Sequence, residues 1–219
     1  MIPLRDVIPS RTTPYITVTI IIINALAWFV ELTQPADVLP VFLRVYGVVP
    51  GRFHASTLLT SMFLHGSWMH AIGNMWYLWI FGDNVEDRLG HGRFIAFYLL
   101  CGIAAAVGQI VIEPRSTLPI IGASGAIAGV VGAYFVLYPH SRVLTLVPLI
   151  IFWEVIEMPA ILLLGFWFLM QLFSAGAIAV TASTGGGGVA FMAHVAGFLT
   201  GVVGVFVFRQ RQRPEDYWA

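Results

Sequence analysis

The chain has 219 residues, of which 58% are hydrophobic and only 10% are charged. Its mean hydropathy is +0.86. Soluble domains usually carry about 25% charged residues, so this composition excludes an ordinary soluble fold and predicts an all-α integral membrane protein. The formal net charge is zero, which gives no reason to expect a nucleic-acid partner. All basic residues are arginine, so chemistry that needs a lysine is excluded.

Apolar stretches long enough to cross roughly 30 Å of hydrocarbon recur six times along the chain. The first follows Arg5 and Arg11 and is longer than the apolar part of a signal peptide, so we expect a retained span. Residues 143–153 are apolar but too few to span, which predicts an interfacial or partly re-entrant loop. The glycine-rich tract 181–188 predicts a flexible outer loop. The expected spans, in a single membrane domain of residues 1–219, are 13–31, 57–82, 94–112, 122–139, 158–177 and 188–208.

The arginines predict which side of the membrane each loop faces, because cytoplasmic loops carry an excess of basic residues. With both termini in the cytoplasm, eight arginines lie inside and three outside. The inner ones are Arg5, Arg11, Arg88, Arg93, Arg142, Arg209, Arg211 and Arg213, and the outer ones are Arg44, Arg52 and Arg115. The second, fourth and sixth spans then run from the outer face inwards.

Few polar side chains lie within the expected spans. His65, His70 and Asn74 belong to the second span, Ser124 starts the fourth, and His194 lies near the beginning of the sixth. Polar groups are costly in a membrane and usually functional. Because all three spans descend from the outer face, we expect these groups to lie at a similar depth.

Small residues surround Ser124 and His194. Gly125 follows the serine, and Gly197 and Gly201 share a helical face with the histidine, three and seven positions after it. Faces of small residues let two helix backbones come close together. We therefore expect the fourth and sixth spans to pack together and to bring Ser124 within hydrogen-bonding distance of His194.

A serine hydroxyl becomes a good nucleophile when a base accepts its proton, and a buried neutral histidine suits that role. Since no carboxylate is expected inside the spans, a Ser124–His194 dyad is favoured over a triad, and another group must orient the ring. His70 and Asn74 lie one helical turn apart and can donate hydrogen bonds towards one point. Together with the backbone N–H of Ser124, they are typical of an oxyanion hole.

Each residue taken alone has other interpretations. A serine in a membrane helix often bonds its own helix backbone, and a buried His/Asn pair can bridge two helices. His65 and His70 lie about 140° apart around a helix, with no cysteine or acid to complete a ligand set. Neither a metal site nor a cofactor is therefore predicted.

Three motifs occur in order along nearly the whole chain. They are His65-Gly-Ser-Trp-Met-His70-Ala-Ile-Gly-Asn74, Gly122-Ala-Ser124-Gly125 and Ala193-His194-Val-Ala-Gly197-Phe-Leu-Thr-Gly201. Together they resemble the rhomboid family of intramembrane serine proteases. Gly82, Glu86 and Gly90 also resemble that family's glycine-flanked glutamate, which helps to fix a loop.

This resemblance implies a rhomboid-like bundle of six transmembrane helices with a water-filled catalytic cavity open to the outer side. It implies that Ser124 is the nucleophile, His194 the general base, and His70 and Asn74 the oxyanion donors. The implied substrates are single-span membrane proteins that enter laterally near the fifth span. The implied supporting residues are His65, Glu86, Gly122, Gly125, Gly197 and Gly201. We expect a bacterial plasma membrane and leave the oligomeric state open.

Ala128 departs from the family pattern. This position is often aromatic in the family and packs under the base, so stacking against His194 must come from elsewhere here. An alternative function on the same fold is a catalytically inactive relative that binds and escorts membrane proteins. Such a protein would need neither Ser124 nor His194.

Overall fold

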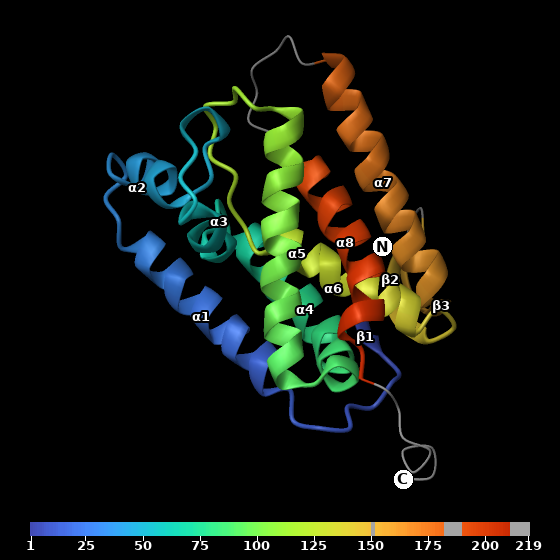
Figure 1. Ribbon diagram of the computed structural model, residues 1–219. Helices are drawn as coiled ribbons and strands as arrows, with labels where there is room; N and C mark the ends of the chain where they lie inside the picture. The colour runs from blue at the N-terminus through green and yellow to red at the C-terminus, as the bar shows by residue number, and fades with distance from the viewer. Residues whose placement is uncertain (150–151, 182–189, 211–219) are drawn as a thin grey trace.

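The computed structural model describes residues 1–149, 152–181 and 190–210 (Figure 1). This part of the chain is mostly helical, with six helices of 14 to 22 residues. They are α1 (Tyr15–Leu32), α4 (Trp68–Leu89), α5 (His91–Ile112), α6 (Ser124–Leu137), α7 (Ala160–Thr181) and α8 (Phe191–Phe208). Shorter elements at one end are α2 (Leu39–Tyr46), α3 (Thr57–Thr60) and 3-10 turns at Pro50–Arg52 and Ser61–Phe63.

Among the described residues, α1, α5 and α8 are long and apolar enough to cross a membrane. The helix α6 is apolar but has 14 residues, so it rises only about 21 Å. The helix α7 contains the apolar stretch Ala160–Ser174. These helices make the chain a helical membrane protein, while the crossing of a bilayer by six helices remains a prediction.

The second expected span, 57–82, does not coincide with a single helix. Its first residues form α3 and a 3-10 turn, and α4 begins only at Trp68, because Ser67 caps it by accepting a hydrogen bond from the backbone N–H of His70. The helix then continues through a charged stretch to Leu89 and ends at Gly90, whose φ of +79° favours glycine. The charged residues after position 82, which suggested the end of the second span, thus form the last turns of α4.

The charged end of α4 holds the start of α1. Pro14 gives α1 no side-chain cap, and instead the Glu86 carboxylate accepts hydrogen bonds from the backbone N–H groups of Ile16 and Thr17, at 2.9 and 2.8 Å. A carboxylate is favoured at the positive end of a helix. A Cβ atom at Gly82 would lie 3.0 Å from the Thr17 side chain, so the glycine permits this approach.

The expectation of a loop at 143–153 is wrong, and a small sheet accompanies the expected helical bundle. The strands β1 (Ile2–Asp6), β2 (Arg142–Leu149) and β3 (Phe152–Pro159) form an antiparallel sheet in the order β1-β2-β3. Val143 and Thr145 are buried and alternate with more exposed residues, which is the period of a strand. The outward residues Leu144 and Leu146 are also apolar, so the sequence does not show the alternation of polar and apolar residues that marks a strand.

Three expectations concern residues that the structure does not describe. The expected flexible loop at 181–188 lies outside the described residues except for Thr181, which ends α7. Residues 188 and 189 of the expected span 188–208, and the arginines at 211 and 213, also lie outside them. Within the described residues, the last helix begins at Phe191.

The helix α6 lies inside the bundle, next to α5 and α8 (Figure 1). Its residues from Gly125 to Tyr134 are all buried. A Cβ atom at Gly197 would lie 2.1 Å from the carbonyl oxygen of Gly125, and one at Gly201 would lie 1.9 Å from that of Gly129. The backbones of α6 and α8 are therefore in direct contact, and this contact sets the relative position of their first turns.

Candidate active site

A glycine turn positions Ser124 at the start of α6. Gly122 has φ +123°, a conformation that residues with a side chain rarely adopt, and its N–H donates to the carbonyl oxygen of Ser61 at 2.8 Å. Ser124 follows as the first residue of the helix and is half-buried. The first N–H groups of a helix have no partner within it, so those at this end remain available to a substrate.

His194 lies in the first turn of α8 and is 9% exposed. Its Nε2 atom lies 2.8 Å from the Ser124 hydroxyl oxygen. The Gln109 side chain on α5 holds the same turn by accepting a hydrogen bond from the Ala193 N–H at 3.2 Å. The structure thus brings together the serine and the histidine that the small helix faces predicted as neighbours.

Two side chains of α7 orient the imidazole. The Nδ1 atom of His194 lies 2.8 Å from Oε1 of Gln171, and the Trp167 ring lies 6.0 Å from the imidazole centroid, at an angle of 37°. An amide oxygen only accepts, so the proton sits on Nδ1, and the Nε2 lone pair faces Ser124. The group expected to orient the ring in the absence of an aromatic residue at Ala128 therefore comes from α7.

His70 borders the same space as Ser124. A Cβ atom at Gly122 would lie 2.7 Å from Nε2 of His70 and 3.5 Å from the Ser124 hydroxyl oxygen. The Nδ1 atom of His70 accepts from the Gly66 N–H at 3.5 Å, which leaves Nε2 as the donor on the side of Ser124. Any side chain at position 122 would fill the space between them.

Asn74 lies one turn after His70 on α4 and is 7% exposed. Its side-chain Nδ2 has no hydrogen-bond partner among the described residues. A buried donor without a partner is costly, and such groups often serve a bound ligand. The oxyanion role of Asn74 remains a prediction.

His65 packs by its ring edge against Trp28 and His70, with centroid distances of 6.4 and 5.2 Å. Its backbone N–H donates to both carboxylate oxygens of Glu31, at 3.0 and 3.1 Å. Glu31, in the last turn of α1, is 1% exposed. The expectation of no carboxylate within the spans therefore missed Glu31, although its described partner is the His65 backbone and not the base.

A half-buried serine hydroxyl thus lies within hydrogen-bonding distance of a buried imidazole, inside a helical membrane protein. The comparison with known families gives the family to which such a protein belongs. Residues 52–211 match the rhomboid domain, and the chain belongs to the rhomboid family. The resemblance predicted from the three sequence motifs is thereby confirmed.

Several relatives have names that include rhomboid. The chain is 31% identical over 195 residues to Rhomboid-like protein 11, chloroplastic, of Arabidopsis thaliana, a match that covers 84% of this chain and 65% of that protein. It is 42% identical over 76 residues to Rhomboid protease GluP of Bacillus subtilis, covering 35% and 14%. It is 31% identical over 112 residues to Rhomboid protein 1, mitochondrial, of Saccharomyces cerevisiae, covering 48% and 32%. The chain thus spans less than two thirds of the length of each.

Proposed function

We propose that this chain is an intramembrane serine endopeptidase that cleaves single-span membrane proteins. The observation that carries the proposal is the 2.8 Å separation between the Ser124 hydroxyl oxygen and Nε2 of His194, at the start of two helices in direct backbone contact. Support also comes from membership of a family whose relatives include named proteases. Ser124 is the proposed nucleophile and His194 the proposed general base.

In this mechanism His194 accepts the hydroxyl proton at Nε2 while the Ser124 oxygen attacks the scissile carbonyl carbon. The tetrahedral intermediate collapses when His194 returns that proton to the leaving amine, which breaks the C–N bond and leaves an acyl-serine. A water molecule, deprotonated by His194, then hydrolyses the ester. Gln171 keeps Nδ1 protonated throughout, so that Nε2 faces the reacting atoms.

The oxyanion of the intermediate is proposed to receive hydrogen bonds from Nε2 of His70, Nδ2 of Asn74 and the backbone N–H of Ser124. Two observations support this: His70 and Ser124 border the space beside Gly122, and the Asn74 amide lacks another described partner. Donors that are already in place stabilise developing charge without reorganisation. Removal of one such donor typically costs about 3 kcal/mol of activation free energy.

Substrates are proposed to enter between α7 and the rest of the bundle. In Figure 1, α7 stands at the periphery of the bundle, and it exposes large apolar side chains such as Leu162, Phe166 and Phe173. Such a helix can separate from its neighbours at a lower cost than the buried α6. Because Gln171 belongs to α7, substrate entry would act directly on the group that orients the base.

The alternative is a catalytically inactive rhomboid relative that binds and escorts membrane proteins. That function places no demand on the Ser124 and His194 side chains, whereas the hydrogen bonds of His194 to both Ser124 and Gln171 are those a general base requires. The discriminating observation is covalent labelling of Ser124 by a fluorophosphonate probe. An escort protein without an activated serine would not react.

The experiment that tests the proposed function is cleavage of a single-span reporter protein by the purified full chain in liposomes. We expect the wild type to cleave and to react with the fluorophosphonate, and Ser124→Ala to lose both activities completely while its melting temperature is unchanged. Cleavage retained by Ser124→Ala, or a wild type that is inert to both reporter and probe, would overturn the proposal.

A further inference from the structure

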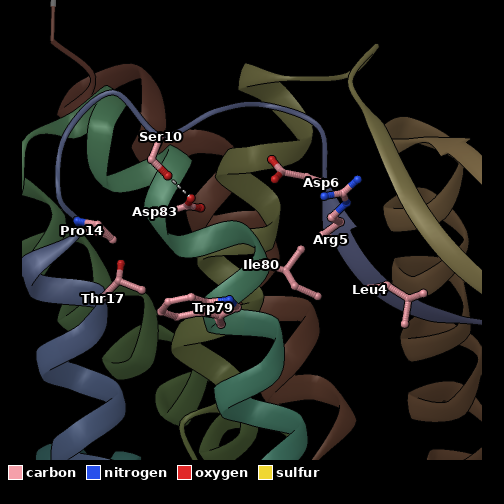
Figure 2. Close-up of a pocket in the computed structure, with 9 residues that line it drawn as sticks. All are labelled: Leu4, Arg5, Asp6, Ser10, Pro14, Thr17, Trp79, Ile80 and Asp83. Carbon is pink, nitrogen blue, oxygen red and sulfur yellow. Dashed lines mark hydrogen bonds between the residues drawn. The ribbon is translucent and has the colours of Figure 1, made fainter.

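A cavity of about 260 Å³ lies at the end of the bundle opposite the short helices α2 and α3. The N-terminal segment forms one wall, and the last half of α4 forms another (Figure 2). It is smaller than the roughly 300 to 1,000 Å³ of pockets for whole small molecules. Its size suits a compact polar group of a few atoms whose remainder lies outside.

The cavity lies where α4 changes from apolar to charged. Trp76 and Trp79 are 42% and 59% exposed, and Asp83 follows one turn later. Exposed tryptophans mark the boundary between hydrocarbon and head groups in membrane proteins. A cavity lined by both Trp79 and Asp83 therefore lies at the depth of lipid head groups and beside the acyl chains.

Charges of both signs line this cavity. Arg5 is exposed on β1 and makes no ion pair within the described residues. Asp6 and Asp83 share one amide donor, because Nδ2 of Asn84 lies 2.9 Å from Asp6 and 3.0 Å from Asp83. Two carboxylates that share one donor favour a cation beside them, and the arginine that lines the same cavity favours an anion.

A metal ion suits this site poorly. Within the described residues no group of three or more His, Cys, Asp or Glu side chains could hold one. A primary ammonium needs fewer ligands, because each of its three N–H groups takes one acceptor. Both side-chain donors to Asp6, Asn84 and the Tyr134 hydroxyl, bind its Oδ2, so Oδ1 has no side-chain donor among the described residues.

We propose that this cavity binds the head group of an ethanolamine phospholipid. The phosphate pairs with the Arg5 guanidinium, the ammonium lies against the Asp6 and Asp83 carboxylates on the cavity side, and the acyl chains run along the exposed Trp79 and Trp76 rings. A bound lipid would add to the hydrogen bonds that already join the N-terminal segment to α4, such as that of the Ser10 hydroxyl to Asp83. The proposal is independent of the proposed protease activity.

The test is the melting temperature of the full chain in detergent micelles with added phosphatidylethanolamine or phosphatidylglycerol. We expect the ethanolamine lipid to stabilise the wild type at lower concentration than the glycerol lipid. Arg5→Gln and Asp83→Asn should each raise the half-maximal ethanolamine-lipid concentration about tenfold, because each removes one charge-assisted hydrogen bond. Arg52→Gln and Glu154→Gln are matched controls, since both residues are exposed and lie outside the cavity.

Three results would overturn the proposal. In the first, both lipids stabilise the wild type equally, and this stabilisation is lost in Arg5→Gln but kept in Asp83→Asn. That result would indicate a phosphate site without selection for the amine. Stabilisation that persists in both variants would indicate general solvation by lipid, and no stabilisation of the wild type would exclude a site. Arg5→Gln keeps the test valid if Asp83→Asn disturbs the fold, because Arg5 is exposed.

Discussion

At the scale of single residues, Gln171 is the side chain whose role is easiest to separate from folding. Gln171→Leu keeps most of the volume but removes the acceptor for Nδ1 of His194. We expect kcat for the single-span reporter to fall about tenfold with KM little changed, because one hydrogen bond that orients the base is lost. Gln171→Glu retains an acceptor and should retain more activity.

The control is Leu172→Ala on the same helix, where the leucine is 45% exposed and lies away from the base. Its kcat should match the wild type. Equal losses in Gln171→Leu and Gln171→Glu, accompanied by a lower melting temperature in both, would instead show that Gln171 only packs α7 against α8.

The sequence predicted the members of the candidate site unevenly. Ser124 and His194 lie in motifs with small residues at helical spacing, so their proximity could be predicted from the packing of two small faces. Gln171 and Trp167 lie in an apolar span without a motif, and the sequence analysis missed both. The one signal that could have found them is a glutamine within a span, four residues after a tryptophan. A partner that depends on how a peripheral helix rotates cannot be read from a single sequence.

At the scale of elements, the contact between α6 and α8 makes a sharp prediction. Gly201→Ala places a Cβ atom 1.9 Å from the Gly129 carbonyl oxygen, and a backbone atom cannot rotate away. We expect a loss of stability near the upper end of the about 1 to 3 kcal/mol typical of overpacking, with loss of cleavage because Ser124 and His194 separate. Thermal unfolding in detergent measures the first effect, and reporter cleavage the second.

Gly92→Ala on α5 is the matched control, because a Cβ atom there meets nothing within 4 Å. Alanine is favoured over glycine in a helix by roughly 0.5 to 1 kcal/mol, so this variant should melt at the same or a slightly higher temperature. If the two variants were destabilised equally, close backbone contact would not be what holds α6 against α8.

The buried carboxyl of Asp6, on the first strand of the sheet, predicts that stability depends on pH. Asp6 on β1 accepts hydrogen bonds from the Tyr134 hydroxyl and from Asn84, and burial raises the pKa of its carboxyl from 3.8 to about 6. The folded protein therefore holds this proton more tightly than the unfolded chain. The contribution of Asp6 to stability is fully present below about pH 3.8 and is lost as the pH rises through 6.

Asp6→Asn removes this titration while keeping the shape of the side chain. The melting temperature of the variant minus that of the wild type should be larger at pH 7.5 than at pH 4.5, because only the wild type must bury a charge at the higher pH. Other titrating groups are common to both proteins and largely cancel in the difference. A difference that is the same at both pH values would refute a raised pKa for Asp6.

Element boundaries were predicted less well than element identities. The helical stretches were recognised by their apolar length, but the end of α4 was missed because its charged residues bind the N-terminal segment, as Glu86 does with Thr17. The sheet was missed because both faces of β2 carry apolar residues. Charged residues, and the alternation of polar with apolar residues, are used to predict which side chains face solvent. Both signals mislead where charged side chains bind other parts of the protein or where apolar side chains are exposed on its surface.

At the scale of the whole molecule, hydrogen bonds join both ends of the described chain to the helix α4. Pro3 accepts a hydrogen bond from the Trp76 side chain at 2.6 Å, and the Gln210 N–H donates to the carbonyl oxygen of Arg88 at 3.0 Å. The start of the described chain therefore lies beside the first half of α4, and its last residue, Gln210, lies at the charged end of that helix. That both termini are cytoplasmic, in the plasma membrane of a bacterium, remains a prediction.

Cysteine labelling tests this orientation, because the only cysteine, Cys101, is fully buried and should give no background. His54 and Glu154 are exposed and are not among the arginines that predicted the topology. His54 precedes α3 and Glu154 belongs to β3, and these two elements stand towards opposite ends of the molecule (Figure 1). In intact bacterial cells, a membrane-impermeant maleimide should label His54→Cys but reach Glu154→Cys only after the cells are opened. The reverse pattern would invert the orientation, and labelling of both from outside would mean that α4, α5 and α6 together do not carry the chain across the bilayer.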